Sequence, residues 1–221
     1  MNTLNNNKGD IINKSLYTFT LFIMLLRKYM ISILRTDIPV GGFLSILFYV
    51  SIGLLFLQFL IRKRHNITEI LILGIACILY IFTREGSILV IILLAISIRD
   101  INDKYVVKSY MLLSAIFMIG CILMGNLMTD IAQVPEVHYR FIDGKYIPRE
   151  TFGFVNPNSV FLFILPIYAG YIYLRFDKYN LYDRLLLIVT TVYIYQNTMS
   201  RTGLITIVGA LLFVEILKFI D

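Results

Sequence analysis

The feature that most constrains this chain is the alternation of long uncharged apolar runs with short charged connectors. No charged residue occurs between Thr151 and Leu174, and Phe43 to Ile61 is equally free of charge. A helix needs about 20 consecutive apolar residues to cross the hydrocarbon core of a bilayer. Several such runs in one chain predict an all-α fold, a polytopic bundle of transmembrane helices.

The composition agrees with this class. Hydrophobic residues make up 58% of the chain, charged residues make up 15%, and the mean hydropathy is +0.79. A soluble domain of this size needs a larger charged surface. We therefore predict one integral membrane domain over residues 1–221, located in the cell membrane as a multi-pass protein.

About eight spans are predicted. The first is interrupted by Arg27 and Lys28. The third and fourth are shorter than an ideal span, so they form either a tight hairpin of thin helices or a partly re-entrant pair. The predicted spans cover residues 16–34, 43–61, 67–82, 86–98, 110–128, 157–174, 185–199 and 203–220.

The orientation follows from the Lys and Arg residues. With a cytoplasmic N-terminus, 12 of the 20 basic residues fall on the inner side, and many of these lie in three short connectors. Short cytoplasmic loops are enriched in Lys and Arg. Both termini are therefore predicted to be cytoplasmic, and the main outer loop is predicted at 129–151. The connectors are Arg62 to Arg64, Arg99 to Lys108 and Arg175 to Arg184.

The net charge of +6 is explained by loops that face anionic lipid, so we expect membrane lipids and no nucleic acid as partners. Cys77 and Cys121 both fall inside predicted spans, where a cysteine behaves as a small apolar residue. The sequence holds no cluster of His and Cys with metal-ligand spacing, so no metal site is predicted.

Polar groups are predicted to gather at the outer ends of the last three spans. Asn156 has the chemistry of a helix N-cap and Pro157 that of a first helical residue, so they place the start of the sixth span. The outer turn between the last two spans is equally polar. Its members are Gln196, Asn197, Ser200, Arg201 and Thr202.

Arg201 has two interpretations. A guanidinium held close to the hydrocarbon edge can bind two phosphate oxygens at once in a low-dielectric setting. It can equally extend to the lipid headgroups and only anchor the helix. Arg149 either faces a ligand or solvent, and Asn156 and Asn158 either line a site or only start a helix.

The other charged groups have simpler interpretations. Arg140 and Lys145 are interpreted as solvated charges of the outer loop. His138 is the histidine on the outer side and hence the acid/base candidate there, although a lone loop histidine usually has no catalytic role. Glu215 and Lys218 are interpreted as a local ion pair.

Two motifs together resemble a known family. Arg149-x-x-x-Gly153-Phe154-x-Asn156-Pro157-Asn158 stands at the head of a span, and Ser200-Arg201-Thr202-Gly203 follows at the outer turn one hairpin later. This arrangement is similar to that of the Wzy-type bacterial repeat-unit polymerases of capsular polysaccharide and O-antigen. The resemblance is sharpest over 149–203 and loose over the rest of the chain.

The resemblance implies an inverting glycosyl transfer at the outer face of the bacterial cytoplasmic membrane, with no nucleotide sugar and no obligatory metal or other cofactor. A hydroxyl of one lipid-linked repeat unit attacks the anomeric carbon of a glycan on undecaprenyl pyrophosphate, and the lipid pyrophosphate leaves. Arg149 and Arg201 would neutralise the leaving charge, and His138 is a weak acid/base candidate. Asn156, Asn158 and Ser200 would bind substrate. Other polysaccharide export and assembly proteins are implied partners.

The chain departs from the family in one respect. Such polymerases are usually longer, and their second half carries a large outer loop with a His-Asn motif. We therefore expect a truncated polymerase, a split gene product or a small relative without this chemistry, and the enzyme assignment stays open. The alternative is a non-enzymatic transporter or flippase subunit for a lipid-linked or anionic substrate.

Overall fold

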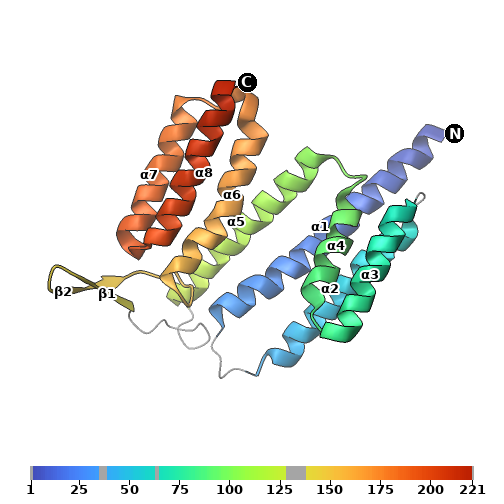
Figure 1. Cartoon of the computed structure of the whole chain (residues 1–221), viewed down its shortest axis with the longest axis horizontal. Helices are drawn as coiled ribbons and strands as arrows, with labels where there is room; N and C mark the ends of the chain where they lie inside the picture. The colour runs from blue at the N-terminus through green and yellow to red at the C-terminus, as the bar shows by residue number, and fades with distance from the viewer. Residues whose placement is uncertain (1, 35–38, 63–64, 128–137, 221) are drawn as a thin grey trace. The chain divides into compact units, whose positions relative to one another are not determined.

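The structure, a computed structural model, describes residues 2–34, 39–62, 65–127 and 138–220. Parts of the predicted outer loop (129–137) and of one basic connector (63–64) lie outside these residues. The described chain is mostly helical, and Figure 1 shows the order of its elements. The helices are α1 (Asn2–Ile33), α2 (Gly41–Ile61), α3 (Ile67–Thr83), α4 (Gly86–Ile98), α5 (Asp103–Leu127), α6 (Pro157–Arg175), α7 (Leu181–Thr198) and α8 (Arg201–Ile220).

Five of these helices are long and apolar enough to cross a membrane, which agrees with a helical membrane bundle. Two predicted spans correspond to shorter apolar helices, α3 and α4. At about 1.5 Å per residue, the 13 residues of α4 extend about 20 Å. α7 has 18 residues but carries several polar ones. The count of eight spans and the cytoplasmic termini therefore stay predictions. The five segments are Asp10–Ile33, Gly41–Ile61, Asp103–Gly125, Pro157–Lys178 and Arg201–Ile220.

The chain divides into two compact units. Unit 1 comprises Met1–Arg27 and Val40–Ser109, and unit 2 comprises Lys28–Pro39 and Tyr110–Asp221. Within unit 1, α2, α3 and α4 pack around Leu55 and Leu93, which are fully buried. α3 and α4 are joined by Arg84 and Glu85 alone, so the two short helices follow each other through a tight turn, and the spanning and re-entrant alternatives both stay predictions.

Within unit 2, close helix packing depends on glycines. A Cβ on Gly203 of α8 would lie 2.2 Å from the Phe161 ring of α6, so only glycine permits this approach. Gly153 has a φ of +81°, and a Cβ there would lie 2.4 Å from the Cys121 carbonyl oxygen of α5. Phe154 beside it is fully buried, and its ring stacks on Phe163 at 4.8 Å. Both glycines belong to the motifs singled out in the sequence.

The described chain is 82% helical, which agrees with the predicted all-α membrane bundle, and one two-stranded antiparallel sheet accompanies the helices. β1 (His138–Ile142) pairs with β2 (Lys145–Arg149), with Ile142 opposite Lys145. The connecting Asp143 and Gly144 have φ values of +48° and +79°, which define the two-residue turn favoured in hairpins. Part of the predicted outer loop is therefore an ordered hairpin.

The two ends of the helices α6, α7 and α8 differ in chemistry. We call the end with Asn156 and Thr198 to Arg201 the hairpin end, and the end with Arg175 to Arg184 the paired end. At the paired end Arg175 Nε lies 3.0 Å from Asp183 Oδ1, and Arg184 Nη2 lies 2.8 Å from Glu215 Oε2. The predicted Glu215–Lys218 pair is wrong, because Glu215 pairs with Arg184 and Lys218 donates to the Tyr179 carbonyl.

Candidate functional site at the hairpin end

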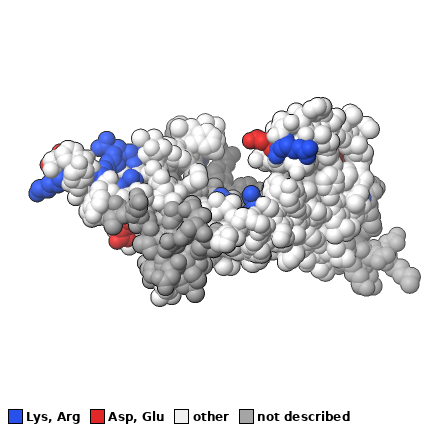
Figure 2. All heavy atoms as spheres, turned by 90° about the horizontal axis from the view of Figure 1, so that it is seen from below, with Lys and Arg blue, Asp and Glu red and all other residues white. Residues whose placement is uncertain are grey.

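The hairpin contacts the helices through one of its two faces. Cross-strand pairing places His138, Arg140 and Arg149 on the same face, because residues two apart along a strand point to the same side. All three are half-buried, and all three donate to backbone carbonyls of the helix ends. In Figure 2, Lys and Arg atoms gather at the left, where the hairpin lies.

Arg149 is held by two contacts. Its Nε donates to the Thr198 carbonyl at 2.6 Å, and its Nη2 donates to Asn158 Oδ1 at 3.0 Å. Arg140 donates through Nη1 to the Met199 carbonyl. Thr198 ends α7 and Met199 is its left-handed C-cap, so both arginines bind the negative end of the helix dipole.

The electrostatic state of Arg149 reflects this setting. Burial lowers its pKa, and the neighbouring positive charge of Arg140 lowers it further. No ion pair links Arg140, Arg149 or Arg201 to a carboxylate among the described residues. Carbonyl oxygens stabilise a guanidinium but carry no full negative charge. The cluster therefore keeps a net positive charge next to solvent.

Arg201 is the first residue of α8 and follows Met199 by two positions, so it extends the same cationic region. Its side chain is exposed, and no hydrogen bond from it to the described residues is seen. Lys145 is exposed at the tip of the hairpin, as predicted. The expectation that Arg140 is a solvated loop charge is wrong, because its guanidinium is fixed on the end of α7.

The predicted substrate-binding residues have structural contacts as well. Asn156 is the N-cap of α6 and Pro157 its first residue, as predicted, and Asn156 Oδ1 accepts from Asn158 N at 2.8 Å. Asn158 in turn orients Arg149. Ser200 is buried, and its Oγ accepts from Gly203 N at 3.2 Å at the start of α8. Their roles toward a substrate stay predictions.

His138 lies beside this cluster. Its Nε2 is 2.9 Å from the Val155 carbonyl oxygen. Since a carbonyl only accepts, Nε2 donates in this contact, and in the neutral imidazole Nδ1 is then the acceptor nitrogen. The backbone of Glu150 donates to the Asn197 carbonyl at 2.9 Å and fixes the end of β2 on α7.

The second face of the hairpin is aromatic and points away from these contacts. Tyr139, Phe141 and Tyr146 are 58%, 62% and 73% exposed. The rings of Phe141 and Tyr146 pair across the strands with their centroids 5.0 Å apart. The hairpin therefore has an aromatic face opposite the face that carries His138, Arg140 and Arg149.

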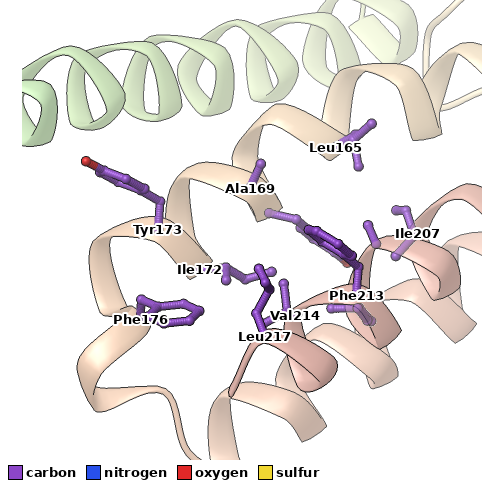
Figure 3. A pocket seen from close by; sticks show the side chains of 12 residues that line it. Leu165, Ala169, Ile172, Tyr173, Phe176, Ile207, Phe213, Val214 and Leu217 are labelled. Atoms are coloured by element: carbon purple, nitrogen blue, oxygen red, sulfur yellow. The ribbon is translucent and has the colours of Figure 1, made fainter. Parts of the chain in front are cut away.

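An apolar pocket of about 370 Å³ lies between α6 and α8, in the part of these helices nearer the paired end. Figure 3 shows the side chains that line it, among them Leu165, Ile172, Phe213 and Leu217. It begins eight residues along α6 from Pro157, which is about 12 Å at 1.5 Å per residue.

Comparisons with models of protein families, with curated proteins and with solved structures found no match to this chain. Among the described residues no group of His, Cys, Asp and Glu could hold a metal ion.

Proposed function

We propose that the hairpin end binds the diphosphate of a lipid-linked glycan, and that the chain takes part in polymerising undecaprenyl-pyrophosphate-linked repeat units at the outer face of the bacterial cytoplasmic membrane. One observation carries this proposal. Arg140 and Arg149 are fixed on backbone carbonyls of α7, with no carboxylate partner among the described residues, beside the exposed Arg201. Such a cluster suits a ligand that brings the missing negative charge.

The chemistry of the transfer gives each part a role. The arginines stabilise the pyrophosphate as the bond from the anomeric carbon to its oxygen breaks. His138 Nδ1 is the candidate acceptor for the proton of the attacking hydroxyl. The aromatic face with Tyr139, Phe141 and Tyr146 lies on the other side of the hairpin, so it suits sugar rings remote from the diphosphate, whose C–H faces stack on aromatic rings.

The lipid part of the substrate requires an apolar surface. Pocket-lining residues of α6 and α8, from Leu165 to Phe176 and from Ile207 to Leu217, provide one in the same unit. A chain that starts from a diphosphate at Arg149 has to pass about 12 Å along α6 to reach it. A long isoprenoid tail can extend over this distance and reach the pocket.

Transport of a lipid-linked or anionic substrate is the second candidate function. It is favoured by polar side chains buried within the apolar helices of unit 1, namely Thr20, Ser51, Gln58 and Ser97. Buried polar groups within membrane helices often mark a substrate path. Movement of a lipid-linked oligosaccharide across proteoliposomes without chain elongation would favour this function over polymerisation.

The test is polymer length on a gel, in the strain that carries this protein, with the chain replaced by Arg201→Lys or Arg149→Lys at matched protein level. Lysine keeps the charge but loses the planar fork that meets two oxygens. We expect shorter polymer in both strains. Arg184→Lys is the matched control, since Arg184 is bound to Glu215 at the paired end. Polymer of normal length in both test strains would remove the support for an arginine-based diphosphate site.

A further inference from the structure

Two buried polar side chains meet where α1, α2 and α4 of unit 1 come together. Gln58 of α2 is 4% exposed and Ser97 of α4 is 7% exposed. Gln58 Nε2 reaches the carbonyls of Asn13 and Ser97 at 3.4 and 3.5 Å, which are long for hydrogen bonds. Gln58 Oε1 and Ser97 Oγ have no partner among the described residues. Buried polar atoms of this kind are rare and costly.

A small cavity lies at this point. Its volume is about 10 Å³, and its polar edge is formed by Asn13, Gln58, Arg62, Ser97 and Asp100. A cavity needs a volume of roughly 10–15 Å³ to hold one water molecule. The site therefore has room for a single small ligand, and it has two unpartnered polar groups to bind that ligand.

The surrounding charges decide which ligand fits. Arg62 lies 2.5 Å from Asp100 and 3.3 Å from Glu69, and Arg99 also pairs with Glu69. The charges of the two arginines and the two carboxylates therefore cancel. A cation would add an uncompensated charge beside the Arg62 guanidinium, and an anion would face the acceptor Gln58 Oε1. A neutral ligand that can both donate and accept is favoured.

We infer that this cavity binds one ordered water, which donates to Gln58 Oε1, hydrogen-bonds the Ser97 hydroxyl and so joins α2 to α4 beside α1. The water extends the Arg62–Asp100–Glu69 network into the apolar part of the unit. Half of the Asp100 side chain is exposed, so a route for exchange with solvent begins at its carboxylate. Waters of this kind typically make about three hydrogen bonds.

The direction in which one substitution changes the melting temperature distinguishes a cavity that holds water from a dry one. If the water is bound, Ser97→Ala removes one of its partners and lowers the melting temperature of the purified protein in detergent. If the cavity is dry, the same change removes an unsatisfied buried hydroxyl and raises the melting temperature. Ser51→Ala is the matched control, because Ser51 is also buried but donates to the Leu47 carbonyl within its own helix at 2.8 Å.

The direct measurement is a water–protein nuclear Overhauser effect at the Gln58 side-chain amide of the full chain, selectively labelled at glutamine. We expect a cross-peak to a long-lived water in the wild type, its loss in Ser97→Ala, and a larger drop in melting temperature for Ser97→Ala than for Ser51→Ala. Absence of the cross-peak in the wild type, or a higher melting temperature for Ser97→Ala, would overturn the inference.

Discussion

The two ends of α6, α7 and α8 hold their arginines in different ways. At the paired end, Arg175 and Arg184 bind the carboxylates of Asp183 and Glu215. At the hairpin end, Arg140 and Arg149 bind backbone carbonyls. A carboxylate neutralises the positive charge of the arginine that it pairs with. A backbone carbonyl carries no full negative charge, so an arginine that it holds can still bind an anionic ligand. The contrast separates a structural end from a candidate binding end within one unit.

The largest expected effect concerns which side of a membrane each end faces. In a background without Cys77 and Cys121, a cysteine at the exposed Lys145 should react with a membrane-impermeant thiol reagent in intact cells. A cysteine at the exposed Lys178 of the paired end should not react until the cells are opened. This result follows from the positive-inside bias of the paired end. The reverse labelling pattern would place the hairpin in the cytoplasm and would exclude an outer-face site.

The next effect concerns the stability that the close approach of Gly153 to α5 gives to the hairpin end. Gly153→Ala forces a side chain into a positive-φ position and against the Cys121 carbonyl, so we expect a loss of about 2–4 kcal/mol of unfolding free energy. Thermal unfolding in detergent measures it. Gly209→Ala is the control, since a Cβ there has no neighbour within 4 Å. That helix change should be neutral or stabilising by up to about 1 kcal/mol. Equal results for the two variants would show that Gly153 does not fix this end.

A smaller effect concerns the paired end and depends on pH. The hydrogen bond from Tyr171, with further help from Asn180 N and Arg175, lowers the pKa of Asp183. Its folded-state pKa is thus below the unfolded value of about 3.9, so its contribution to stability is present above that pH and is lost as the pH falls through the folded pKa. Asp183→Asn should lower the melting temperature at pH 7 and flatten its dependence below about pH 4. An unchanged acid profile would show that Asp183 does not stabilise this end.

Local sequence signals could predict much of this fold. The long apolar runs indicate the five long apolar helices, and Asn156-Pro157 marks the start of α6. Asp143-Gly144, between strands of alternating exposure, is a strong signal for a two-residue hairpin turn, although the polarity of the segment led to the prediction of a loop. Features that depend on a few neighbouring residues could therefore be predicted from the sequence.

Contacts between residues far apart in the sequence could not be predicted. Arg140 binds the Met199 carbonyl 59 positions away, and no sequence pattern indicates this pairing. Arg184 lies 31 positions from Glu215, whereas Lys218 lies only three away, so helical spacing favoured the wrong partner. The candidate residues Arg149 and Arg201 could be chosen from their position near a membrane edge, but the carbonyls that fix Arg149 could not.

In the function proposed here, the hairpin end keeps positive charge without a carboxylate partner and uses it to bind a diphosphate. The most direct test is binding of undecaprenyl pyrophosphate, compared with undecaprenol, to the purified chain in nanodiscs of neutral lipid. A charge-assisted hydrogen bond contributes about 1.5–3 kcal/mol, so Arg149→Lys should weaken the pyrophosphate-dependent binding by about tenfold or more, and Arg184→Lys should leave it unchanged. Equal affinity for the two lipids, or equal losses in the two variants, would contradict the claim.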